Sequence, residues 1–176
     1  KLMPPKPKNN LWGTYRSVQG QMGQDELGRF YKDLGLAATD PLTCVLAFFS
    51  GSKEPAIWTE LEFKNVCDRV KAWELQNFKA KIEGLRNEWL KNDANWKKVW
   101  AYVWQLYSGG QKYISADTFI GLTRILLENR YPLATSFVEF FELMQEKDEK
   151  LVIYKDLWDM GLQFLMTSKE DLSNIN

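Results

Sequence analysis

Apolar side chains recur at three- and four-residue steps along much of this chain, which is the spacing that places them on one face of an α-helix. Three such stripes stand out. They consist of Leu75, Phe78, Ile82, Leu85 and Trp89; of Trp96, Val99, Trp100, Val103 and Tyr107; and of Phe137, Phe140, Phe141 and Met144. We interpret the stripes as core-packing faces of helices. Because no strand longer than about three residues is predicted, we expect an all-α fold.

Two helix starts can be placed from local signals. Asp40 is followed by Pro41, which combines a capping side chain with a proline at the first helical position. Thr59 is followed three residues later by Glu62, the spacing of a capping box. We therefore predict helices that begin at these two points.

A further pattern occurs four times: an apolar residue precedes a helix start, and a large apolar residue follows five positions later. The pairs are Met22 with Leu27, Trp58 with Phe63, Ile114 with Phe119, and Ile153 with Trp158. In an EF-hand, the first residue of such a pair joins two loops through a short β-bridge, and the exit helix packs by the second. We predict two pairs of degenerate EF-hand-like helix–loop–helix units.

The same loops lack the ligands that calcium requires. The loop that contains Ile153 has Lys150 at its fifth position, Leu151 where a glycine is needed and Leu157 in place of the final glutamate. The other three loops are no better supplied with acids. We therefore expect no calcium binding, no other metal and no cofactor.

Composition narrows the classes of function. The chain has 176 residues, and its 23 Lys and Arg balance its 23 Asp and Glu, so no overall positive charge points to nucleic acid. Between Glu139 and Asn176 acidic residues outnumber basic ones, which suits a basic partner. No apolar run approaches about 18 residues, so we expect no membrane-spanning segment.

The chain contains no histidine, which excludes histidine-based acid–base catalysis and histidine metal ligands. Cys44 and Cys67 lie in apolar helical surroundings and form no CxxC motif, which is typical of buried free thiols. An enzyme that uses one of these thiols is a remote alternative.

Four segments, taken together and in order, resemble the potentiating-neddylation domain of the defective-in-cullin-neddylation family. They are FYKDLGLAATDPLTCVLAFF, WTELEFKNVCD, GGQKYISADTFIGLTRIL and KLVIYKDLWDMGLQFLMTSKEDLSNIN. The resemblance covers residues 11–176, and we expect residues 1–10 to be a flexible linker or a remnant of cloning. It implies an all-α fold built on EF-hand-like repeats. We also expect the C-terminal end of the domain to be missing from this sequence.

The resemblance implies a scaffold and not an enzyme. Members of the family hold a cullin and the conjugating enzyme that carries the neddylation modifier, beside the cullin's RING subunit. Such a co-ligase acts through proximity and restricted orientation of the reacting partners.

Two sites are implied by the resemblance. An apolar pocket receives the N-terminally acetylated methionine of the conjugating enzyme, and acetylation removes a terminal charge that would be costly to desolvate. The matching positions are Met22, Leu27, Val45, Leu46, Trp58, Leu106 and Ile125. An acidic patch binds the cullin, and its first aspartate matches Asp156 in YKDLW. The patch's other two residues would follow the run that stops here at Asn176.

The residues also allow an alternative, a calcium-independent EF-hand-like module that binds some other amphipathic helix. Dependence on an acetylated methionine separates the two functions. We expect a monomer that is intracellular, in the nucleus or the cytoplasm.

Overall fold

A computed structural model of the chain describes residues 11–127, 130–169 and 171–173. The linker predicted at residues 1–10 lies outside this range. The described residues are predominantly helical, so the all-α prediction is confirmed. The chain divides into two compact units, Lys1–Val99 and Trp100–Asn176, and the boundary falls within helix α6 (Asp93–Ser108).

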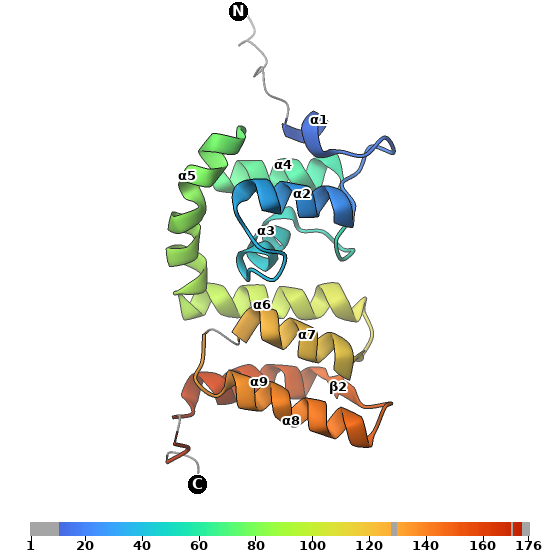
Figure 1. Cartoon of the computed structure of the whole chain (residues 1–176), viewed down its shortest axis with the longest axis vertical. Helices are drawn as coiled ribbons and strands as arrows, with labels where there is room; N and C mark the ends of the chain where they lie inside the picture. Colours follow the sequence, from blue (N-terminus) through green and yellow to red (C-terminus); the bar gives the residue numbers. More distant parts are fainter. Residues whose placement is uncertain (1–10, 128–129, 170, 174–176) are drawn as a thin grey trace, which may run out of the picture. The chain divides into compact units, whose positions relative to one another are not determined.

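The longer elements described in the first unit are helices. Before α6 its elements are α1 (Leu11–Tyr15), α2 (Gln24–Leu34), α3 (Leu42–Ser50), α4 (Glu60–Val70), α5 (Leu75–Leu85) and the π-helical segment η1 (Arg86–Leu90). Helix α3 packs on α4, and α2 packs on α1 and α5. In Figure 1, α5 runs crosswise to α2 and α4. At the centre, the Phe30 ring lies 5.1–5.5 Å, between ring centroids, from the rings of Tyr15, Phe63 and Phe78.

The start of α4 at Thr59 is confirmed, and α3 begins at Leu42, one residue later than predicted, so that Pro41 and not Asp40 is its N-cap residue. Thr59 caps α4: its Oγ1 accepts a hydrogen bond from the Glu62 backbone N at 3.4 Å, and Glu62 Oε2 accepts one from the Thr59 backbone N at 2.6 Å. Asp40 Oδ1 accepts a bond from the Leu42 backbone N at 2.9 Å, so it satisfies the first turn of α3.

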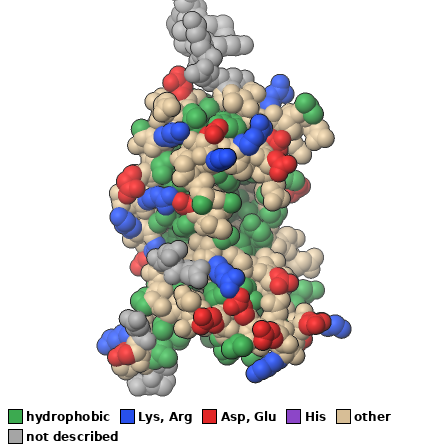
Figure 2. Space-filling view, viewed as in Figure 1, with side chains coloured by type: hydrophobic (Ala, Val, Ile, Leu, Met, Phe, Trp, Pro, Cys, Tyr) green, Lys and Arg blue, Asp and Glu red, His purple; other side chains and the backbone are tan. Residues whose placement is uncertain are grey.

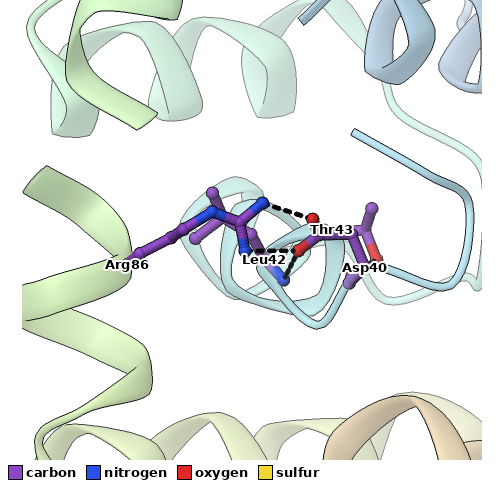
Figure 3. A network of polar contacts seen from close by, with 4 residues as sticks. All are labelled: Asp40, Leu42, Thr43 and Arg86. Atoms are coloured by element: carbon purple, nitrogen blue, oxygen red, sulfur yellow. Dashed lines mark hydrogen bonds and ion pairs between the residues drawn. The ribbon is translucent and has the colours of Figure 1, made fainter. Parts of the chain in front are cut away.

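Asp40 has a second partner far away in the sequence. The Arg86 guanidinium donates to both Asp40 carboxylate oxygens, with Nη1 at 3.1 Å from Oδ1 and Nη2 in a shorter contact with Oδ2 (Figure 3). The exposed fractions of the two side chains are 29% for Arg86 and 13% for Asp40. The pair therefore links the start of α3 to η1 through a partly buried ion pair.

The apolar residues of the four predicted joints meet in two pairs. In the first unit, Met22 and Trp58 form an isolated antiparallel bridge, in which each backbone N donates to the other's carbonyl oxygen at 2.8 Å. In the second unit, Ile114 lies opposite Ile153 in a two-stranded antiparallel sheet. The comparison with EF-hands itself stays a prediction.

The second unit contains the end of α6 and two helix pairs joined by that sheet. Its further elements are β1 (Tyr113–Ser115), α7 (Ala116–Leu127), α8 (Ala134–Lys147), β2 (Val152–Tyr154) and α9 (Lys155–Thr167). Helix α7 packs against α8. Ser115 caps α7, since its Oγ accepts a bond from the Thr118 backbone N at 3.2 Å.

All three predicted core stripes are only partly buried, and in the first of them Leu75 and Ile82 are half-buried. Phe141 packs on Phe119 of α7 at a centroid distance of 4.8 Å, but Phe140 is 55% exposed and Met144 is 37% exposed. The apolar arc of α8 is thus wider than the face that α7 covers. In α6, Tyr107 is 40% exposed, because its hydroxyl group permits a position at the surface.

Candidate functional site

The start of α9 carries the predicted cullin-binding residue, and a tryptophan fixes how this helix is rotated. Trp158 is fully buried, its ring stacks on Trp100 with 3.9 Å between centroids, and its Nε1 donates to the Trp100 carbonyl oxygen at 3.3 Å. Leu162 and Leu165 are buried on the same face. Because these three residues occupy one side of α9, Asp156 lies on the exposed side.

Asp156 is a solvent-exposed acid in the first turn of α9. Its Oδ1 accepts a hydrogen bond from the backbone N of Leu157 at 2.9 Å. A negative charge at this position is favoured by the helix dipole, so the Asp156 carboxylate also stabilises the start of α9. Its neighbours Lys155 and Asp159 form an i, i+4 ion pair with each other. The carboxylate therefore remains available to a basic group of a partner.

Acidic side chains gather on the surface of the second unit. Figure 2 shows Asp and Glu clustered over its helices. On α8 and α9 acidic residues outnumber basic ones. This distribution suits a basic partner surface, since complementary charges guide association.

The residues predicted for the acetyl-methionine pocket are largely core residues. Five belong to the first unit and are at most 3% exposed: Met22, Leu27, Val45, Leu46 and Trp58. The structure brings Met22 and Trp58 together in the bridge described above. Leu106 and Ile125 belong to the second unit, where Leu106 is buried and Ile125 is half-buried. The pocket itself stays a prediction.

The two cysteines are poor nucleophiles. Burial raises the pKa of the Cys44 thiol to about 11 and that of the Cys67 thiol to about 12. Near neutral pH both are protonated, and the protonated thiol is not the reactive form. The structure thus gives no support to the alternative of a cysteine-based enzyme.

Within the described ranges, no three side chains of the His, Cys, Asp or Glu type gather where they would hold a metal ion. None of the helices described is both long and apolar enough to cross a membrane.

Comparison with known proteins decides the family. The sequence pattern of a family described as "Cullin binding" matches residues 77–176, which is more than half of the chain and includes Asp156. This chain belongs to the cullin-binding family. Its resemblance to the defective-in-cullin-neddylation proteins is thereby confirmed.

Three similar proteins are named as DCN1-like proteins. This chain is 25% identical over 155 residues to DCN1-like protein 4 of Drosophila melanogaster, a match that covers 87% of this chain and 60% of the relative. DCN1-like protein 2 of Dictyostelium discoideum is 24% identical, with coverages of 87% and 56%. DCN1-like protein 3 of Xenopus laevis is 24% identical, with coverages of 86% and 50%. The chain thus spans about half to three-fifths of the length of these relatives.

Sequence reasoning missed two exposed apolar residues on α9, Met160 and Phe164, which are 66% and 37% exposed. The signal was present, because Asp156, Met160 and Phe164 follow one another at four-residue steps and so share one helix face.

Proposed function

We propose that this protein is a non-catalytic scaffold that promotes cullin neddylation. It binds a basic surface in the C-terminal region of a cullin through the exposed side of α9, and it binds the acetylated N-terminus of the neddylation conjugating enzyme. The observation that carries the proposal is the match to the cullin-binding family over residues 77–176, with Asp156 exposed at the start of α9.

Two features support a scaffold and not an enzyme. The chain has no histidine, and its two thiols are protonated near neutral pH. The conjugating enzyme supplies the reactive groups, so this protein needs only to hold the two reactants close together. Holding two reactants together raises their effective concentration without any catalytic group on the scaffold.

The peptide-binding part of the proposal rests on the apolar character of the seven predicted pocket residues. Because most of them are buried, binding requires side chains to move apart before a methionine can enter. An acetylated terminus favours such entry, since a free ammonium group would bring a charge into apolar surroundings.

Reconstituted neddylation tests the scaffold. A cullin with its RING subunit, the charged conjugating enzyme and catalytic amounts of this protein are combined, and modified cullin is measured over time. We expect the rate to rise with added protein and the rise to persist after both cysteines are changed to serine. An unchanged rate, or a rise that is lost with the cysteines, contradicts the proposal.

Calorimetry tests the peptide arm separately. The N-terminal peptide of the conjugating enzyme is titrated into the protein with and without its acetyl group. We expect micromolar binding of the acetylated peptide that is lost without the acetyl group. Equal binding of both forms favours the alternative helix-binding module, and absence of binding by either form contradicts this arm.

A further inference from the structure

A short segment, residues 52–57, connects two parts of the predicted acetyl-methionine pocket within the first unit. It follows Gly51, the residue that ends α3, and it leads into Trp58, itself a predicted pocket residue. The segment belongs to no helix or strand. Since α3 carries Val45 and Leu46, the segment joins two elements that both contribute predicted pocket residues.

The elements at both ends of the segment are held by specific contacts. Helix α3 is fixed at its start by the Asp40–Arg86 pair. Its end is fixed by Asn65, whose Nδ2 donates to the Ser50 carbonyl oxygen at 3.1 Å. At the other end of the segment, Trp58 is held by the two backbone bonds of the β-bridge. An outward movement of residues 52–57 breaks none of these contacts.

Ser52 holds the segment in its closed position. This residue is 4% exposed. Its Oγ lies 2.9 Å from the Glu54 carbonyl oxygen and 2.8 Å from that of Ile57, and it accepts a bond from the Glu54 backbone N at 3.3 Å. A hydroxyl group has one proton to share between two such carbonyl acceptors. The closed position therefore depends strongly on a single side chain.

Ala56 opposes the closed position. Its φ is +56°, in the left-handed region, which is unfavourable for a residue that has a Cβ atom. Strained residues of this kind persist only where the surrounding contacts enforce them, and they are common in segments that switch between two positions. The segment is thus held closed by one residue and strained at another.

We infer that residues 52–57 form a lid over the first-unit part of the predicted pocket, which Ser52 keeps closed and which moves outward when the acetylated peptide binds. The inference rests on the peptide-binding part of the proposed function. The peptide binds the fraction of molecules whose lid is open, so its apparent affinity scales with that fraction. Opening relieves the strain at Ala56, and this relief raises the open fraction.

Calorimetric titration of the acetylated peptide tests the lid. The variants are Ser52→Ala, which removes the hydroxyl group that closes the lid, and Ala56→Gly, which removes the strain. Lys71→Gly is the matched control for the second variant, because Lys71 also has a positive φ, +55°, but ends α4 and is not a predicted pocket residue. Urea unfolding of each variant measures its stability.

We expect Ser52→Ala to bind the acetylated peptide about twofold to tenfold more tightly than the wild type although it is less stable, since the closed lid loses hydrogen bonds. A purely structural role would lower affinity and stability together. Ala56→Gly should bind about twofold to fivefold more weakly, because glycine adopts the closed conformation without strain. Lys71→Gly should change the affinity less than about twofold.

The outcomes separate the lid from the proposed function. If the wild type binds the peptide and Ser52→Ala binds it equally or more weakly, the lid is overturned and the proposed peptide binding stands. Equal effects of Ala56→Gly and Lys71→Gly on the affinity also overturn the lid. Absence of binding by both the wild type and Ser52→Ala overturns the lid together with the peptide-binding part of the proposed function.

Discussion

Replacing Asp40 by asparagine should lower the free energy of unfolding by about 1–2 kcal/mol. Asparagine is as good a helix cap as aspartate and keeps an oxygen for the Leu42 backbone N, so the change removes the charge and spares the cap. What is lost is the charge-assisted pairing with Arg86 (Figure 3). This pairing fixes the start of α3, the helix that carries two of the predicted pocket residues.

The size of the effect follows from burial. Hydrogen bonds to charged groups contribute about 1.5–3 kcal/mol when desolvated, whereas exposed ion pairs contribute about 0–1 kcal/mol. Asp40 is 13% exposed and Arg86 is 29% exposed, so this pair lies between the two cases. The Lys64–Asp68 pair, with exposed fractions of 58% and 49%, belongs to the second case.

A double-mutant cycle measures the coupling. Urea unfolding followed by tryptophan fluorescence is applied to Asp40→Asn, Arg86→Met and the combined variant. We expect a coupling free energy of about 1–2 kcal/mol, against about 0.3–0.5 kcal/mol for the same cycle with Lys64→Met and Asp68→Asn. If the two cycles give equal coupling, the argument from burial is wrong.

Four further predictions concern a helix cap, two glycines and the two cysteines. Thr59→Ala removes the side-chain cap of α4 and should cost about 1 kcal/mol in urea unfolding; no loss would mean that the cap contributes nothing. Gly121→Ala, where an added Cβ meets no atom within 4 Å, should stabilise by about 0.5–1 kcal/mol. Gly161→Ala should be less stable than Gly121→Ala by about 1–3 kcal/mol, because its Cβ would displace a phenylalanine ring; equal stabilities would contradict the observed packing. Cys44 and Cys67 should resist alkylation at pH 8 in the native protein, and rapid alkylation of the native protein would contradict this. The free energy of unfolding should fall as pH rises above about 9, because the thiols ionise there in the unfolded chain. In the folded protein their pKa values are raised to about 11 and about 12, so they stay protonated.

The sequence predicts local features of the fold well and long-range features poorly. The Thr59 cap was identifiable because its partner Glu62 lies three residues away. The Asp40–Arg86 pair spans 46 residues and has no local signal. The apolar stripe on α8 predicts the helix but not which of its residues are exposed, because burial of Phe140 depends on which neighbouring element covers it.

The candidate site was predicted from the family resemblance and not from local sequence signals. Asp156 came from the family resemblance, because an acid in the first turn of a helix is common for reasons of the helix dipole alone. Its exposed position follows from Trp158, whose partner Trp100 lies 58 residues earlier. The exposure of Met160 and Phe164 on α9 was not predicted, because it depends on which neighbouring element covers them.

The proposed scaffold function is tested most directly by the affinity of this protein for a cullin C-terminal fragment, measured by calorimetry for the wild type, Asp156→Arg and Asp25→Arg. Asp25 is a matched control, an exposed acid in the first turn of α2 with the same relation to a helix dipole. We expect Asp156→Arg to weaken binding at least about tenfold, as loss of an interfacial charge pair does, and Asp25→Arg to change it less than about twofold. Equal affinities for the wild type and Asp156→Arg would contradict the account.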